Sequence, residues 1–284
     1  MHEKYGILYI VATPIGNLDD FSKRGHKILS EATWVAAEDT RHSRILLEHL
    51  GIKKSLLAYH AHNEQAQAAQ LIQRLLKGES GCLISDAGTP LISDPGHVLV
   101  NQAYAKGIKV VPIPGPCAAM TALSGLGVGA APFYFEGFLP AKATLRAKRL
   151  AQLTDNVATL IFYEAPHRIG ATLDAMKEAF GDHRFAGIGR EMTKKFESFY
   201  RGNLSQLTEI LKSGEIPIKG EFVIVVQGAP ATTACPPTEL EHLLTILLTE
   251  LPLKQAVTLT TQWSGSNKNE VYDMALALKA KLKA

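Results

Sequence analysis

The sequence predicts an α/β protein with two α/β domains followed by a small helical domain. Three observations lead to this prediction. Short β-rich apolar segments alternate with segments of helical period, the texture of the chain changes after Gly115, and a Pro/Ala/Thr-rich stretch precedes the last part. The chain has 284 residues and 46% hydrophobic content, which suffices for one large domain or two medium ones. We expect domains at residues 1–120, 121–230 and 238–284.

The first domain shows the alternation most clearly, and such alternation is typical of a largely parallel sheet covered by helices. Asp39 or Thr40 is placed to cap the second helix, and Gly51 follows its end. The predicted strands are Ile7–Ala12, Trp34–Ala37, Leu56–Tyr59, Cys82–Ser85 and Lys109–Pro112, and the predicted helices are Lys23–Glu31, Arg41–Leu50, Glu64–Leu76 and His97–Lys106.

A stretch of small residues from Ala118 to Ala131 marks the domain boundary that we expect near residues 118–130. A second α/β set follows it. Asn203 and Gln206 form a plausible capping pair for its last helix. The predicted strands are Phe133–Phe138, Val157–Tyr163, Phe185–Arg190, Ser198–Arg201 and Phe222–Gln227, and the helices are Ala143–Leu153, Arg168–Phe180 and Leu204–Leu211.

The last part of the chain reads as a linker followed by three short helices. Residues Gly228–Pro237 have the composition of a linker. Thr238 with Glu241 suits a capping box for the first of the helices Glu239–Glu250, Leu253–Trp263 and Lys268–Lys281. A helix-turn-helix around Gly265 is one interpretation, but residues 239–284 carry five Lys against five Asp and Glu. A module for packing or substrate docking is therefore favoured over a DNA-groove reader.

Composition and missing motifs exclude several classes of protein. The formal net charge is only +3, so a nucleic acid must be held by a local patch. The three cysteines form no C-x-x-C pair, and no third ligand joins His60 and His62, so we expect no disulfide framework and no metal. Apolar runs are too short for a membrane span, and the N-terminus does not open a signal peptide, which predicts a cytoplasmic protein. Phosphate-loop, zinc-protease, esterase-elbow and G-x-G-x-x-G motifs are absent from the sequence.

Three loops of the first domain are rich in Gly, Pro and small polar residues: Ala12–Asp20, Ser85–Gly96 and Pro112–Ala118. Ligands of open α/β sheets bind beyond the carboxyl ends of the strands, where these loops lie. The middle loop lets backbone groups approach a ligand closely, and Leu91 with Ile92 can cover a flat ring, which suits a nucleoside. The alternative is a pair of tight turns with an Asp that caps a helix.

Four polar clusters also fall at segment ends: Ala37–Ser43, His60–Glu64, Tyr163–Arg168 and Arg190–Phe196. Each cluster mixes a carboxylate with Arg, His or Lys. For any one cluster, N-caps and solvated first-turn charges are the commoner explanation. A basic patch suited to a phosphate backbone, or else a solvated helix face, is formed by Lys142, Arg146, Lys148 and Arg149.

These loops and clusters, in this order, resemble the tetrapyrrole methylase superfamily. Within it they resemble the branch that methylates a cytidine 2′-hydroxyl in 16S ribosomal RNA. The first loop, Thr13–Asn17, differs from the G-x-G-P-G-D type of the porphyrin- and corrin-methylating branch, which argues against a tetrapyrrole substrate. The resemblance covers nearly the whole chain and rests on Ala12–Leu18, Ala37–Arg41, His62–Glu64, Ser85–Gly96, Pro114–Pro116, Glu164–Arg168, Arg190–Lys194 and the tail segments Leu253–Val257 and Asn269–Asp273.

The resemblance implies two α/β domains of the tetrapyrrole methylase type with S-adenosylmethionine in the cleft between them, a homodimer, and the 30S subunit or its 16S RNA as partner. Carried over by position, the implied cofactor-binding residues are Pro14, Asp86, Ala87, Gly88, Thr89, Pro90, Ile92, Ser93, Cys117, Ala118, Phe162 and Tyr163. The implied substrate-binding residues are Arg41, Asn63, Lys142, Arg146, Arg149, Arg168, Glu191 and Lys194.

Methyl transfer to a ribose hydroxyl requires alignment of the reacting atoms and removal of a proton from a weakly acidic alcohol. Our candidate proton acceptors are Glu38, Asp39, His62 and Glu64. The alternative function is methylation of a tetrapyrrole or another small molecule. That function would need neither the basic patch nor the helical tail, so deleting the tail would leave its rate unchanged.

Overall fold

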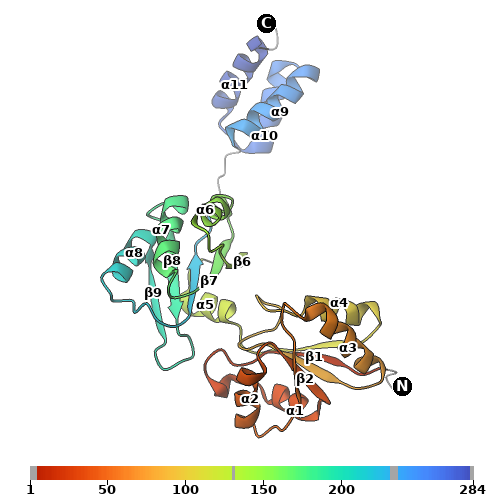
Figure 1. Ribbon diagram of the computed structural model, residues 1–284. Helices are drawn as coiled ribbons and strands as arrows, with labels where there is room; N and C mark the ends of the chain where they lie inside the picture. The colour runs from red at the N-terminus through yellow and green to blue at the C-terminus, as the bar shows by residue number, and fades with distance from the viewer. Residues whose placement is uncertain (1–4, 130–131, 231–235, 282–284) are drawn as a thin grey trace. The chain divides into compact units, whose positions relative to one another are not determined.

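The computed structural model describes residues 5–129, 132–230 and 236–281, and it divides into two compact units, residues 1–228 and 229–284 (Figure 1). The first unit contains two separate five-stranded sheets. The second unit is a small bundle of helices. None of the helices in the described residues is long and apolar enough to cross a membrane.

The first sheet is parallel throughout, with strand order β3-β2-β4-β1-β5. Every predicted strand and helix of this half is present, and each predicted end falls within one residue of the observed one. A short 3₁₀ helix, η1 (Leu18–Asp20), adds to them. The elements are β1 (Leu8–Val11), α1 (Lys23–Glu31), β2 (Trp34–Ala37), α2 (Thr40–His49), β3 (Leu56–Ala58), α3 (Glu64–Leu76), β4 (Gly81–Ile84), α4 (His97–Ala105) and β5 (Val110–Ile113).

Helices cover both faces of the first sheet, which explains why its strands read as continuous apolar runs. Leu29 of α1 and Leu47 of α2 pack on one face against Val35 and its neighbours. Leu71 of α3 and Leu99 of α4 pack on the other face. This sandwich leaves the carboxyl ends of the strands, with their loops, as the open edge of the sheet.

The second sheet is mixed, with strand order β6-β7-β10-β8-β9. Strand β10 runs antiparallel to β7 and β8, β9 runs antiparallel to β8, and β6 and β7 are parallel. Asn203 and Gln206 form the predicted capping box at α8. The elements are β6 (Phe133–Phe138), α6 (Ala143–Ala151), β7 (Thr159–Glu164), α7 (Ile169–Phe180), β8 (Phe185–Arg190), β9 (Ser198–Asn203), α8 (Leu204–Lys212) and β10 (Phe222–Val226).

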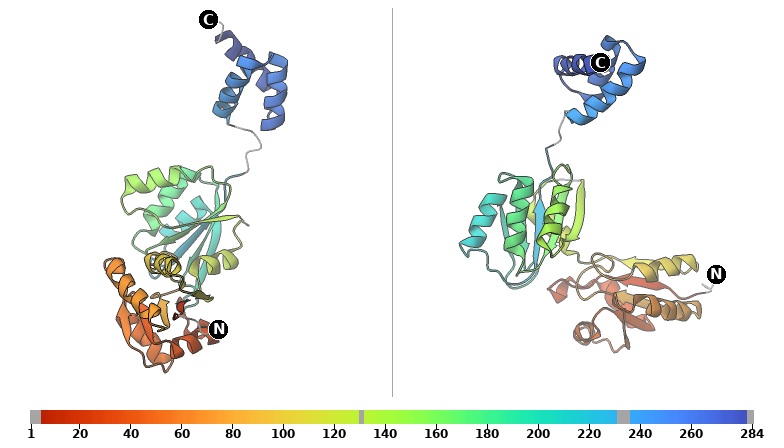
Figure 2. Two further views of the ribbon diagram at one scale, coloured as in Figure 1. Left: turned by 90° about the vertical axis from the view of Figure 1, so that its right-hand side faces the viewer. Right: turned by 45° about the horizontal axis from the view of Figure 1, so that its top comes forward.

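Helices α6, α7 and α8 cover one face of the second sheet, and α5 (Ala118–Leu126) covers the other (Figure 2). This helix was not predicted, because its residues belong to the small-residue stretch 118–131 that was expected to be a domain boundary. Small side chains such as Ala119 and Ala122 let α5 lie close against the sheet. The predicted boundary after residue 120 falls inside α5, and the division at that point stays a prediction.

The second unit is a three-helix bundle of α9 (Pro237–Glu250), α10 (Leu253–Ser264) and α11 (Lys268–Lys281) around a small core that includes Leu244 and Val271. The predicted capping box of Thr238 and Glu241 is wrong, because α9 begins at Pro237 and places Thr238 inside the helix. Gly265 ends α10 in the left-handed conformation, with φ of 66°. The predicted linker includes residues 231–235, which lie outside the described residues.

Candidate functional site

The three Gly/Pro-rich loops follow the neighbouring strands β4, β1 and β5, so the parallel sheet brings them to one edge. Hydrogen bonds join them there. Thr13 N donates to Gly88 O at 2.8 Å, and Gly88 N donates to Thr13 O at 3.1 Å. The Thr89 hydroxyl donates to Pro116 O at 2.9 Å. The loops therefore form one surface whose backbone is fixed by its own contacts.

The middle loop, Ser85–Gly96, turns sharply and comes close to the second sheet. Leu91 and Ser93 adopt left-handed backbone conformations, with φ of 73° and 68°, which residues other than Gly rarely adopt. Such strain gathers at functional sites. Gly137 forms a bulge in β6 with φ of 75°, and a Cβ atom there would lie 3.1 Å from the Ser93 hydroxyl. The loop thus reaches the second sheet at a glycine, where a Cβ atom would make a tight contact with it.

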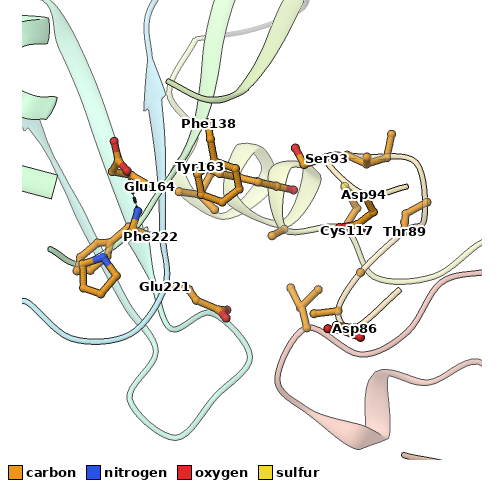
Figure 3. A pocket seen from close by; sticks show the side chains of 18 residues that line it. Asp86, Thr89, Ser93, Asp94, Cys117, Phe138, Tyr163, Glu164, Glu221 and Phe222 are labelled. Carbon is orange, nitrogen blue, oxygen red and sulfur yellow. Dashed lines mark hydrogen bonds between the residues drawn. The ribbon is translucent and has the colours of Figure 1, made fainter. Parts of the chain in front are cut away.

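A pocket of about 360 Å³ lies between the loops of the first sheet and the strand ends of the second. We call it the cleft pocket. Figure 3 shows side chains from the two halves facing each other across it, with Tyr163 and Phe138 opposite Ser93, Asp94 and Cys117. Its lining residues are Ile15, Asp86, Ala87, Gly88, Thr89, Ile92, Ser93, Asp94, Cys117, Ala118, Phe138, Tyr163, Glu164, Ala165, Pro166, Glu221, Phe222 and Val223.

Most residues expected to bind a cofactor lie in this lining: Asp86, Ala87, Gly88, Thr89, Ile92, Ser93, Cys117, Ala118 and Tyr163. Three others do not. Phe162 is fully buried among α6, α7 and α8, because neighbouring strand residues point to opposite faces. Pro90 is buried in the loop, and Pro14 lines a second pocket of about 230 Å³ beside α2, which we call the α2 pocket.

Sequence reasoning missed half of the pocket lining. Asp94 belongs to the predicted loop, and Glu164 to a predicted cluster, so their motifs gave a signal. Phe138, Glu221 and Phe222 gave none, because only the arrangement of the second sheet brings β6 and β10 beside the loops.

Three carboxylates, those of Glu38, Asp86 and Asp94, interact electrostatically at the first wall. Burial and the charges of Glu38 and Asp86 raise the pKa of Asp94 to about 6. Burial and the charge of Asp86 also raise the pKa of Glu38, although His60 opposes this shift. Because each carboxylate disfavours the charge of the others, the group favours a bound cation or a shared proton.

The four predicted proton acceptors have different surroundings. Asp39 caps α2, and hydrogen bonds from Arg41 hold the pKa of its carboxyl well below the usual range. Glu64 Oε1 accepts bonds from the Tyr59 hydroxyl at 3.1 Å and from Gly96 N at 2.9 Å, at the start of α4. His62 is exposed. The Glu38 carboxyl interacts electrostatically with the Asp86 and Asp94 carboxylates of the cleft pocket.

The second wall is built from side chains that bond to one another. The Tyr163 hydroxyl accepts a bond from Ala119 N at 3.1 Å, and the Tyr163 ring packs edge-on against Phe135 and Phe138. Burial raises the pKa of this hydroxyl. Glu164 is buried and accepts a bond from the Thr172 hydroxyl at 2.5 Å.

Predicted substrate-binding residues of the polar clusters are engaged in bonds within the protein. Arg168 forms an ion pair with Glu164 at 3.2 Å and donates to Leu139 O at 2.6 Å. Lys194 Nζ lies 2.9 Å from Glu191 and 3.0 Å from Glu221. Burial lowers the pKa of Lys194, but these bonds outweigh it and raise the pKa.

Two other predicted substrate-binding residues are Arg41, whose exposed side chain bonds Asp39, and Asn63, whose side chain bonds the backbone of Ala58 and His60.

The basic patch is smaller than its sequence suggests. Arg149 forms two bonds with Glu136, at 2.6 and 2.7 Å, and Arg146 is buried and donates to Ala141 O. Lys142 and Lys148 are exposed. The described residues contain no group of three or more His, Cys, Asp or Glu side chains that could hold a metal ion.

A comparison with family models matches residues 7–208 to the tetrapyrrole (corrin/porphyrin) methylases. Residues 236–279 match the model described as the RsmI C-terminal HTH domain. Together the two matches span both units of the structure.

Curated relatives match almost the whole chain. A protein of Xylella fastidiosa (strain Temecula1) is 49% identical over 94% of this chain and 98% of its own length. Proteins of Pseudomonas aeruginosa and Escherichia coli O157:H7 are 48% and 44% identical over 97% and 95% of this chain, covering 99% and 95% of their own length. All three are named ribosomal RNA small subunit methyltransferase I.

Solved structures share the fold at low sequence identity. Uroporphyrin-III-C-methyltransferase from Thermus thermophilus is 20% identical with a TM-score of 0.55, over 78% of this chain and 94% of its own. Diphthine synthase is 16% identical with a TM-score of 0.58, over 78% of this chain and 90% of its own. A second Thermus thermophilus structure, complexed with S-adenyl homocysteine, is 15% identical with a TM-score of 0.53, over 78% of this chain and 97% of its own.

Proposed function

Because this chain belongs to the tetrapyrrole methylase family, we propose that it transfers a methyl group from S-adenosylmethionine to a cytidine 2′-hydroxyl in RNA of the small ribosomal subunit. The observation that carries the proposal is the extent of the similarity. Small-subunit rRNA methyltransferases at 44–49% identity match the C-terminal bundle as well, whereas the solved uroporphyrin methylase covers only 78% of this chain. The small-molecule alternative gives the bundle no role.

The cleft pocket fits S-adenosylmethionine in size and chemistry. Its volume of about 360 Å³ lies within the range of ligand pockets, roughly 300–1,000 Å³. The cofactor carries a carboxylate, an ammonium, a sulfonium and a flat adenine, and the pocket offers a partner for each. S-adenosylmethionine supplies an electrophilic methyl group bound to a sulfonium that leaves as a neutral thioether.

On the first wall, Asp94 would hold the positive groups of the cofactor, and Ala87–Thr89 would contact it through the backbone. Cys117 and Ala118 begin α5, whose first N–H groups favour a carboxylate. On the second wall, Phe138 and Tyr163 would pack against the adenosine part. Pro14, Pro90 and Phe162 have no contact with the pocket in this assignment.

The chain must also take the proton of the attacking hydroxyl. We assign this role to the carboxylates of Glu38 and Asp86. Asp86 Oδ1 accepts a bond from Asp39 N at 2.9 Å, which orients the carboxyl group and leaves Oδ2 for the proton. The charge of Asp86 in turn raises the pKa of the neighbouring Glu38 and Asp94 carboxyls. The methyl group passes to the 2′-oxygen, and the hydroxyl proton passes to Asp86.

The RNA would lie along the exposed lysines of α6 and the Lys194 loop, in a 30S subunit of the cytoplasm. We also propose a homodimer. Edge strand β6 exposes Phe133 and Tyr134, and α6 exposes Leu145, so a second copy would cover an apolar surface. Sedimentation equilibrium should give twice the monomer mass of 30.8 kDa.

Labelled methyl transfer tests the proposed function. Purified protein receives S-adenosylmethionine with a labelled methyl group and 30S subunits that lack the modification, and the 16S RNA is then hydrolysed with alkali. A 2′-O-methyl group removes the internal nucleophile, so we expect the label in an alkali-resistant dinucleotide. Label on a base would contradict ribose methylation. Absence of transfer to 30S subunits, 16S RNA and 70S ribosomes, despite cofactor binding, would favour a small-molecule substrate.

A further inference from the structure

The α2 pocket, beside the cleft pocket, has no role in the function proposed so far. It lies between the first loop, with Pro14 and Leu18, and the first turns of α2, with Ser43 and Ile45. Its volume is about 230 Å³. Asp86 lines both pockets, so the two cavities meet at this side chain. A molecule in the α2 pocket would therefore lie beside the reacting groups of the cleft pocket.

Ser43 gives the α2 pocket a polar group without a partner. Its side chain is 98% buried, and its hydroxyl has no hydrogen-bond partner among the described residues. An unpaired buried hydroxyl costs free energy comparable to a lost hydrogen bond, so such a group calls for an explanation. Beside Ser43 on α2, His42 and Leu46 line the same pocket, and Ile45 stands at its exposed side. A ligand with a hydrogen-bonding edge and apolar faces would satisfy both features.

The covalent structure of the ribonucleotide that accepts the methyl group places a base beside Asp86. In a ribonucleotide the base is bonded to C1′, next to the carbon that bears the 2′-hydroxyl. When that hydroxyl meets the methyl group near Asp86, the base of the same nucleotide must also lie close to Asp86. Enzymes that modify nucleotides hold the unstacked base by hydrogen bonds to its edge and by contacts with apolar side chains.

We propose that the α2 pocket receives the base of the RNA nucleotide that accepts the methyl group, and that the Ser43 hydroxyl bonds the edge of this base. Pro14, Leu18 and Ile45 then contact its faces. This proposal rests on the proposed function and adds a base-binding residue to it. It also gives the first loop, whose residues Pro14, Gly16 and Leu18 line the pocket, a part in substrate selection.

Two variants test the pocket. Ser43→Ala removes the hydroxyl, and Ile45→Trp fills the pocket from an exposed position. Ser30→Ala and Tyr104→Trp are the matched controls, because Ser30 is an exposed helix serine and Tyr104 is 65% exposed, like Ile45. We expect Ser43→Ala to lower kcat/KM for RNA about three- to tenfold, the effect of one hydrogen bond. Ile45→Trp should lower it more, and both controls should match wild type.

Calorimetric titration with S-adenosylmethionine should give wild-type affinity for both variants, which separates a base pocket from a damaged fold. A second substrate carries an abasic ribose at the methylated position. Wild type should methylate it poorly, and Ser43→Ala should cause no further loss on it, since the partner of the hydroxyl is gone.

Equal loss on both RNAs, or an unchanged kcat/KM of both variants, would overturn the base pocket while leaving the proposed function intact. A wild-type protein that methylates no ribosomal RNA would overturn the proposed function itself and the pocket's role with it.

Discussion

The two walls of the cleft pocket are built in different ways. The first wall consists of loops whose backbones bond one another, so its carboxylates Asp86 and Asp94 are turned to the cavity. In the second wall, carboxylates are already paired: Glu164 with Thr172 and Arg168, and Glu221 with Lys194. We propose that the first wall supplies the reacting carboxylates and that the second wall sets the shape of the cavity. Substitutions on the two walls should therefore have different consequences.

The largest expected effect is on folding and concerns the second wall. Glu164→Ala removes a buried carboxylate, so that Arg168 loses its ion-pair partner and the Thr172 hydroxyl loses its acceptor. Breaking a buried ion pair in this way costs about 3–5 kcal/mol of unfolding free energy. Urea unfolding measures it. Glu221→Ala is the control on the same wall, and because its side chain is 75% exposed we expect a change of about 0.5 kcal/mol or less. Similar losses of unfolding free energy for both variants would contradict the expected difference between the buried and the exposed carboxylate.

The next effect is on catalysis and concerns the first wall. Asp86→Asn keeps the shape of the side chain and removes its ability to take a proton, so turnover at saturating substrates should fall roughly 100-fold. Asp39→Asn is the control, because Asn caps a helix as well as Asp does and the Asp39 carboxyl is occupied by Arg41. The rate of labelled methyl transfer measures the turnover of both variants. A larger loss in Asp39→Asn than in Asp86→Asn would reverse our assignment.

Cofactor binding should depend on pH through Asp94. Its pKa is about 6 in the folded protein, above its usual value of about 3.9, so the carboxyl is mostly protonated at pH 5 and ionised at pH 7. A bound cation favours the ionised form. The Kd of S-adenosylmethionine should therefore fall by about tenfold from pH 5 to pH 7, as measured by calorimetry. Asp94→Asn should make the Kd nearly independent of pH over this range. If the variant keeps the wild-type pH dependence, another group causes it.

The smallest expected effect concerns RNA binding outside the pocket. Lys142→Ala removes an exposed charge of the patch, so the salt dependence of RNA binding should lose about one unit of slope. Arg149→Ala should change the slope less, because Glu136 neutralises Arg149. Lys106→Ala, at the end of α4, is a distant exposed control. Filter binding at several salt concentrations measures the slopes, and equal slopes for Lys142→Ala and Lys106→Ala would remove α6 from the RNA path.

The same contrast explains which parts of the molecule were predictable. The strands of the first sheet and the helices that cover it could be predicted from periodicity and capping. The Ser85–Gly96 loop could be predicted because closely spaced Gly and Pro residues are typical of turns. Helix α5 was missed because a stretch of small residues carries no strong periodic signal, although tertiary packing makes it a helix.

Residues of the second wall depend on tertiary structure in the same way. Phe162 and Tyr163 are neighbours in one strand, and only the position of the sheet decides which of them faces the pocket. The charge of the 142–149 segment was visible in the sequence, but the bonds from Arg149 to Glu136 depend on the pairing of β6 with α6.

The most direct test of the two-wall account is a crystal structure with S-adenosylhomocysteine. We predict that the ligand lies in the cleft pocket, with its polar groups at Asp94 and the backbone of Ala87–Thr89, and with its adenosine part against Phe138 and Tyr163. A ligand whose charged groups are bound by Glu164 or Glu221 instead, or one that lies outside the cleft pocket, would contradict the account.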